Sequence, residues 1–244
     1  VWFRRYTTLV KGSAEEAGFK KITMGLWLLL LVIVLPSFIN TGSLYFPDNA
    51  TVQQGAIIIR NYITVGLYLG GFVFLWQASK RFLSTVSGED WAAKYRTIVL
   101  AGVGVLTFVY SWAIFQNSYR SVSADPLVMP TYGLPDLLIV LTIIIPYMLI
   151  WLFGSMAVLN FWSFAKQVPG IIYRQTFYSV AHGLTVTVVL LIGLQFLSQA
   201  NAALNHAALR IILVIIYLLL IAIAIGYLLI ARGAKKLAAI EGVK

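Results

Sequence analysis

Residues 137–161 read LLIVLTIIIPYMLIWLFGSMAVLNF, a run of 25 residues without a charged side chain. A helix of about 20 apolar residues crosses the hydrocarbon core of a bilayer, which is about 30 Å thick. The rest of the chain is similar, because 60% of its 244 residues are hydrophobic, 11% are charged and its mean hydropathy is +0.88. Soluble domains carry about 25% charged residues. The composition therefore excludes a soluble globule and indicates an integral membrane protein.

Five further segments reach or approach the length of a membrane span, and each is bounded by charged residues, Pro, Asn or Gly. Together with the quoted run, the predicted spans are 22–39, 62–78, 98–115, 137–161, 177–197 and 211–231. We predict an all-α fold, a polytopic membrane helix bundle with six transmembrane helices. The predicted domains are a cytoplasmic amphipathic segment at 1–21, a transmembrane domain at 22–231 and a cytoplasmic helical tail at 232–244.

Positive charge is distributed unevenly between the loops on the two sides of the membrane. Of the 18 Lys and Arg residues, only Arg60, Arg120 and Arg210 fall on one side. Short translocated loops are depleted of Lys and Arg, so we predict a cell-membrane protein with both termini in the cytoplasm. Topology then explains the net charge of +10 without nucleic-acid binding, and anionic lipid headgroups are the expected partners of the basic side.

One pattern of residues recurs three times along the chain. Each copy begins with an aromatic and basic entry, continues through an outgoing span, an external turn and a returning span, and ends in basic residues. The entries are Phe19-Lys20-Lys21, Tyr95-Arg96-Thr97 and Tyr173-Arg174-Gln175. We therefore predict three helical hairpins. Ancestral duplication would produce this pattern, and so would convergence, because aromatic and basic side chains both favour the headgroup level.

Small residues on the predicted spans indicate where helices approach one another, because helices in lipid associate through Gly, Ala, Ser and Thr. The predicted packing glycines are Gly66, Gly70, Gly104, Gly183 and Gly226. Pro146 lies near the middle of the fourth span. It removes a backbone hydrogen bond and is expected to bend that helix.

Ionisable side chains are nearly absent from the predicted spans. None of the eight acidic residues lies mid-span, which disfavours a proton or sodium carrier with a buried carboxylate. His182 shares a helix face with Ser179 and Thr185, and Gln195 lies further along the same span. His182 is compatible with haem ligation, with proton relay and with hydrogen-bonded packing. Packing is favoured, because the only other histidine, His206, lies at the opposite membrane face.

Two predicted external loops, 40–61 and 117–136, are rich in Pro and aromatic residues. Loops that a rigid scaffold holds commonly carry function, and these would form either a ligand cup or a lid over the helix ends. The candidate ligand-binding residues in them are Tyr45, Asp48, Arg60, Arg120, Tyr132 and Asp136. The chain has no cysteine, no nucleotide-binding loop and no zinc-protease motif. We expect no enzymatic activity, no metal site and no cofactor.

The C-terminal tail continues with helix-favouring residues beyond the sixth span. The stretch Ala234-Lys235-Lys236-Leu237-Ala238-Ala239-Ile240-Glu241 resembles the signalling helix that follows the membrane part of bacterial multi-pass sensors. This resemblance covers the tail alone. The first functional hypothesis is a non-enzymatic sensory or receptor-like module, or a scaffold subunit, in a homo-oligomer or larger membrane assembly. The alternative is a small transporter or channel, and a haem protein or membrane enzyme built on His182 ranks last.

Overall fold

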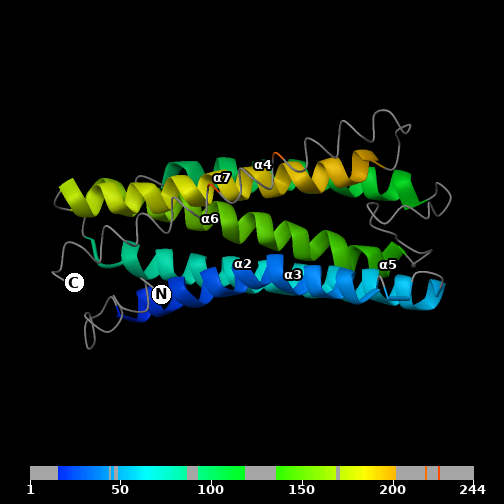
Figure 1. Cartoon of the computed structure of the whole chain (residues 1–244). Helices are drawn as coiled ribbons and strands as arrows, with labels where there is room; N and C mark the ends of the chain where they lie inside the picture. Colours follow the sequence, from blue (N-terminus) through cyan, green and yellow to red (C-terminus); the bar gives the residue numbers. More distant parts are fainter. Residues whose placement is uncertain are drawn as a thin grey trace.

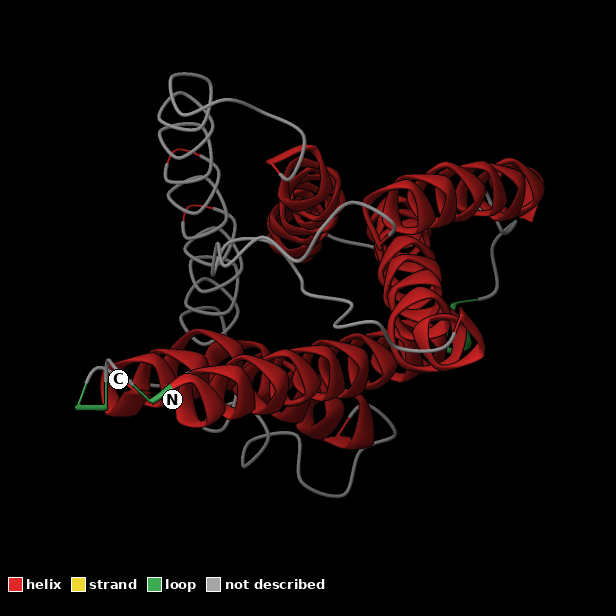
Figure 2. Cartoon of the chain, turned by 90° about the vertical axis from the view of Figure 1, so that its right-hand side faces the viewer, coloured by secondary structure: helices red, strands yellow, loops and turns green. Residues whose placement is uncertain are grey.

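The computed structural model describes residues 16–43, 45–46, 49–86, 93–118, 136–168, 171–201, 218 and 225. Every regular element in these ranges is a helix and none is a strand (Figure 2). The long helices are α2 (Glu16–Ser43), α3 (Ala50–Leu83), α4 (Ala93–Ser118), α6 (Ile145–Gln167) and α7 (Ile171–Asn201). The short α5 (Asp136–Ile139) and the π-helical η1 (Val140–Ile144) lead directly into α6. The all-helical prediction is confirmed for this part of the chain.

Four described helices are long and apolar enough to cross a membrane. They are Tyr62–Leu83, Ala93–Phe115, Asp136–Gln167 and Arg174–Gly193, and they are compatible with an integral membrane protein. They correspond to the second to fifth predicted spans. The first predicted span lies inside α2, which is not among these four. The sixth lies outside the described residues except for Leu218 and Ile225, so the count of six spans is not confirmed.

The central helix of the described bundle is α6. Figure 1 shows the long helices running side by side, with α6 between the α2–α3 pair and α7. α6 packs against α3, α4 and α7, whereas α2 packs mainly against α3. The predicted arrangement as three hairpins is not confirmed, because α6 packs more extensively against α3 and α7 than against α4, its expected hairpin partner.

Local sequence explains where these helices begin and end. The side chain of Asn49 accepts a hydrogen bond of 3.1 Å from the Val52 N–H and so caps the start of α3. α6 ends at Gln167, and the backbone of the following Val168 is extended, as is usual for a residue before proline. The loop between α2 and α3 is shorter than the predicted range 40–61, because α2 continues to Ser43 and α3 already begins at Ala50.

The bundle has one strongly basic end, on the left of Figure 1, where α2, α4 and α7 begin and α3 and α6 end. The described basic residues near these helix ends are Lys20, Lys21, Lys80, Arg81, Lys94, Arg96, Lys166 and Arg174. We refer to it as the basic end and to the opposite one as the far end. Positive-inside topology predicts that the basic end is cytoplasmic.

Glycines bring α2 and α3 into close contact. A Cβ atom on Gly25 would lie 2.9 Å from the carbonyl oxygen of Gly71, a distance that real Cβ atoms essentially never show. Around the middle of α6, a Cβ atom on Gly154 would lie 2.9 Å from Cγ2 of Val188 in α7. Backbones approach this closely only where a side chain is missing, so these glycines set the spacing of α2–α3 and of α6–α7.

The five glycines predicted to mediate packing have different surroundings. A Cβ atom on Gly70 would lie 3.2 Å from Leu28 of α2, and Gly183 is buried in α7. Cβ atoms on Gly66 and Gly104 would meet nothing within 4 Å in the described part of the chain, so neither glycine makes a close contact there. Gly226 lies outside the described residues.

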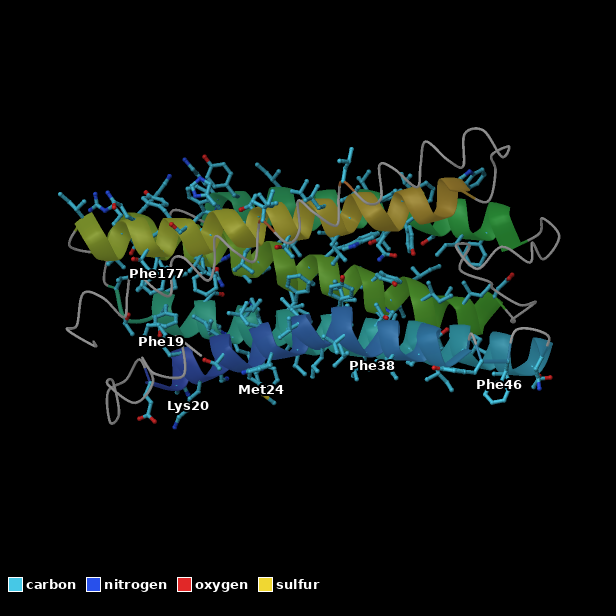
Figure 3. The ribbon with its side chains drawn as sticks, in the orientation of Figure 1. Phe19, Lys20, Met24, Phe38, Phe46 and Phe177 are labelled. Atoms are coloured by element: carbon cyan, nitrogen blue, oxygen red, sulfur yellow. The ribbon has the colours of Figure 1, made fainter. Side chains whose placement is uncertain are left out.

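Large apolar side chains point away from the bundle. Met24 and Phe38 project outward from α2 (Figure 3), and Phe108 and Trp112 of α4 are 71% and 63% exposed. A soluble protein rarely exposes so continuous an apolar surface. A lipid environment accommodates these side chains, in agreement with the apolar length of the helices.

Candidate functional site

A cluster of phenylalanines fills the interior at the basic end. Its members come from α2, α3, α6 and α7, and all are buried: Phe19, Phe82, Phe161, Phe164 and Phe177. Phe82 is central, with ring centroids 4.9 Å from Phe19, 5.3 Å from Phe164 and 5.4 Å from Phe177. Figure 3 shows Phe19 and Phe177 reaching toward one another from α2 and α7. This phenylalanine cluster joins four helices through apolar contacts alone.

Next to this cluster, a buried amide links three helices. Asn160 of α6 is 3% exposed; its Nδ2 donates to Ser79 Oγ of α3 at 3.2 Å, and its Oδ1 accepts from Nη2 of Arg96 in α4 at 3.2 Å. The Ser79 hydroxyl donates in turn to the Trp76 carbonyl at 2.8 Å. We call Ser79, Asn160 and Arg96 the amide bridge. A buried amide is stable in an apolar interior only when it is hydrogen-bonded.

Sequence reasoning missed Asn160 as a site residue. It lies inside the apolar run 137–161 and is the only Asn there. A polar amide within a span commonly bonds to a neighbouring helix, so this was a usable signal. The search for ionisable residues passed over it, because an amide carries no charge.

The continuous helical segment formed by α5, η1 and α6, which we call the α6 segment, contains an irregular turn near the far end. Residues Val140–Ile144 form a π-helical turn, and the Ile145 N–H reaches back five residues to the Val140 carbonyl. Pro146, which has no N–H, follows directly. The local effect beside Pro146 is thus a widened turn. π-helical turns within α-helices are rare and frequently occur at functional sites.

An aromatic site lies beside this turn, between α4, α6 and α7. It consists of Tyr110, Tyr147, Trp151, Gln195 and Phe196. The Tyr110 ring centroid lies 5.2 Å from Trp151, 5.6 Å from Phe196 and 5.8 Å from Tyr147. The Tyr110 hydroxyl donates to Gln195 Oε1 at 3.5 Å, which brings one predicted polar residue, Gln195, into the site.

Trp151 is the distinctive member of the aromatic site. Its side chain is 1% exposed, and its indole Nε1 has no hydrogen-bond partner among the described residues. A buried donor without an acceptor costs about 1–3 kcal/mol. The Trp151 N–H is therefore a place where a bound group with an acceptor oxygen would gain free energy, and the aromatic site is the candidate functional site.

The three other predicted polar residues gather on the surface of α7. His182 is exposed; its Nδ1 lies 2.7 Å from the Tyr178 carbonyl, and its ring centroid is 4.5 Å from that of Trp162. Thr185 Oγ1 accepts from Trp162 Nε1 at 3.1 Å, while the Ser179 hydroxyl donates to the Gln175 carbonyl at 3.0 Å. These contacts match a hydrogen-bonded packing role. No group of three or more potential metal ligands occurs within the described ranges.

The structure describes three of the six predicted loop residues, so the predicted ligand cup stays a prediction. Tyr45 is 79% exposed, and Asp136 begins α5 at the far end, exposed. Arg60 lies on α3 rather than in a loop. Asp48, Arg120 and Tyr132 lie outside the described residues.

No protein-family model, curated protein or solved structure matches the chain.

Proposed function

We propose that the chain is a non-enzymatic, receptor-like membrane module whose ligand-responsive part is the aromatic site. The buried N–H of Trp151, which has no hydrogen-bond partner among the described residues and lies seven residues beyond the π-helical turn, is the observation that carries this proposal. A molecule with a carbonyl or carboxylate oxygen would satisfy this donor. The surrounding rings of Tyr110 and Phe196 would pack against an apolar or planar body.

The position of the aromatic site supports a sensory role. It lies in the half of the α6 segment that begins at Asp136, where the predicted external loop 117–136 enters the bundle. α6 packs against α3, α4 and α7, so a change in its far half would reach three other helices. Coupling of this kind requires that a ligand bind two arrangements of the segment with different affinity. The π-helical turn is the element that would differ between them.

A scaffold subunit of a larger assembly is the second form of this proposal. The basic half of the bundle is filled by phenylalanines and its buried amide is hydrogen-bonded. Such an interior suits a rigid part that holds partners. A receptor would bind a ligand whose oxygen accepts from the Trp151 N–H, whereas a scaffold would need no such ligand. Ligand binding at Trp151 therefore distinguishes a receptor from a scaffold.

The alternative is a small transporter or channel. Pro146 and the adjacent π-helical turn interrupt a predicted span, and interrupted helices in transporters commonly lie at substrate sites. The phenylalanine cluster favours the receptor-like module, because it fills much of the described interior at the basic end, and the buried Ser79 and Asn160 beside it are hydrogen-bonded to protein groups.

Thermal unfolding of the full chain in nanodiscs tests the proposal. We expect a compound from a library of small carbonyl- and carboxylate-bearing molecules to raise the Tm of the natural chain. A compound at about 100 times its Kd adds about 2.7 kcal/mol to the stability. Trp151→Phe should abolish the shift, while Trp162→Phe, a matched change in the basic half, should retain it. A shift that both variants retain, or no shift with any compound, would contradict the aromatic site as a receptor.

Solute flux into proteoliposomes separates the remaining functions. A receptor or scaffold should show no more flux than protein-free vesicles. Flux that Pro146→Ala changes and Phe108→Ala does not would support the transporter. An assembly of defined stoichiometry, cross-linked in native membranes, together with no ligand-induced change in Tm, would support the scaffold.

A further inference from the structure

We infer that the α3–α4 corner of the basic end binds the phosphate of an anionic lipid headgroup. This corner comprises Lys80 and Arg81 at the end of α3 and Lys94 and Arg96 at the start of α4. It lies at the opposite end of the bundle from the aromatic site, so the inference is independent of the receptor proposal.

The amide bridge ties the end of α3 to the start of α4 through α6. Asn160 accepts from Arg96 Nη2 at 3.2 Å on one side and donates to Ser79 Oγ at 3.2 Å on the other. Lys80 and Arg81 directly follow Ser79, and consecutive Cα atoms are about 3.8 Å apart. The backbones that carry the two pairs of basic residues are thus held at the same end of the bundle, while the exposed side chains of Arg81 and Lys94 lie on helix faces turned away from Asn160.

Aromatic contacts place two of the ammonium groups at the level of lipid headgroups. Lys80 Nζ lies 5.7 Å from the centre of the Trp76 ring, and Lys94 Nζ lies 5.0 Å from that of Tyr95. Trp and Tyr concentrate at the boundary between hydrocarbon and water. The apolar stretch of α4 begins at Ile98, two residues beyond Arg96, so the guanidinium also lies near this boundary.

The charges and geometry of the corner suit a phosphate. The stretch 80–96 keeps a net charge of +2 after Glu89 and Asp90 are included. A guanidinium presents a planar fork of N–H donors that matches phosphate oxygens, and lysines add point charges. The bond to Asn160 positions the Arg96 guanidinium before any lipid arrives, which lowers the cost of ordering it on binding.

Two basic residues at this end that lie outside the α3–α4 corner, Lys20 and Arg174, provide a control. Lys20 of α2 pairs with Glu16 at 2.5 Å, so its charge is already compensated. Arg174 lies in the first turn of α7, and its side chain is exposed. Replacing Lys20 and Arg174 therefore removes the same charge from the basic end without altering the α3–α4 corner.

The test compares two double variants of the full chain in phosphatidylcholine nanodiscs with and without phosphatidylglycerol. Retained lipid is measured by native mass spectrometry and stability by thermal unfolding. Arg81→Gln/Lys94→Gln changes two exposed side chains and should weaken phosphatidylglycerol binding about 30-fold, at about 1 kcal/mol for each charge. Lys20→Gln/Arg174→Gln should leave binding within about twofold, because these exposed charges lie outside the corner and are screened by solvent and salt.

Asn160→Leu tests the positioning role of the amide bridge. It leaves every charge in place, yet it should weaken phosphatidylglycerol binding because the Arg96 guanidinium loses its fixed position. Equal losses of phosphatidylglycerol binding in Arg81→Gln/Lys94→Gln and in Lys20→Gln/Arg174→Gln would overturn the inference. They would indicate binding by diffuse surface charge. Stabilisation by inorganic phosphate in phosphatidylcholine nanodiscs equal to that by phosphatidylglycerol would overturn the lipid as the source of the phosphate.

Discussion

The basic half of α6 and its far half bury different kinds of side chain. In the basic half the helix is regular, phenylalanines fill the interior, and the amide of Asn160 has a partner on both sides. The far half begins with Pro146 directly after the π-helical turn, and it contains an indole N–H that has no partner among the described residues. Around Asn160, hydrogen-bonded polar groups and apolar packing favour a single arrangement, although the buried Thr176 Oγ1 at the same end has no hydrogen-bond partner among the described residues. A bound molecule would therefore stabilise the far half more than the basic half.

The largest expected effect is at the centre of the phenylalanine cluster. Phe82→Ala should lower the free energy of unfolding by about 3–5 kcal/mol, because its ring contacts side chains from three other helices. Denaturation in mixed micelles, followed by circular dichroism, measures it. Phe108→Ala, at an outward-facing position of α4, should stay within about 0.5 kcal/mol. Similar values for the two variants would mean that the basic half is not the more tightly packed one.

The next effect is expected where the two halves of α6 meet. Gly154→Ala should cost about 1–3 kcal/mol, because the new Cβ atom would lie 2.9 Å from Val188 Cγ2 and 3.3 Å from Phe72 Cδ1. Gly66→Ala provides the control, since its Cβ atom would meet nothing within 4 Å, and better helix propensity should stabilise it by up to about 1 kcal/mol. A neutral Gly154→Ala would show that α6 and α7 separate easily.

A smaller loss of stability is expected when Trp162, in the basic half, is replaced. Trp162→Phe removes the hydrogen bond from Nε1 to Thr185 at 3.1 Å and should lower stability by about 0.5–1.5 kcal/mol. Thr185→Val supplies the second arm of a double-mutant cycle. If the two losses add fully in the combined variant, the bond makes no contribution to stability.

The smallest change, and the one most informative about the far half, is Trp151→Phe. It deletes a buried donor that lacks a partner and keeps an aromatic ring, so the cost of lost volume and the gain from removing the donor should nearly cancel. We expect a change within about 0.5 kcal/mol in the same denaturation assay. A loss above about 1.5 kcal/mol would mean that the indole N–H is already satisfied, for instance by buried water.

The sequence predicted the helical class and four apolar helices that the structure contains, because span length and hydropathy follow from composition along the chain. Side-chain partners were harder to predict. Gly25 faces Gly71 and Asn160 faces Ser79 only for particular rotations and depths of the helices, which an apolar stretch does not specify. The sequence indicated His182 as a candidate because histidine is an ionisable residue type, yet its side chain is exposed. The uncharged side chains of Asn160 and Trp151 are buried instead.

The predicted loop 40–61 illustrates a second limit. Its residues 50–61 include Gln53, Gln54, Arg60 and Asn61, and their polarity was interpreted as a loop because the helix was expected to end with the apolar span. The Asn49 cap and the continuing backbone hydrogen bonds instead extend α3 to Ala50. Polarity indicates where a segment leaves the lipid, and backbone geometry indicates where a helix stops.

The length of α3 has a consequence for access from outside the lipid. Its 34 residues span about 50 Å at about 1.5 Å per residue, whereas the hydrocarbon core is about 30 Å thick. The span within α3 begins at Tyr62, so a bilayer centred on that span would leave the preceding turns outside the hydrocarbon as a stalk. If the predicted topology holds, a soluble protein outside the cell would reach this stalk without entering the lipid.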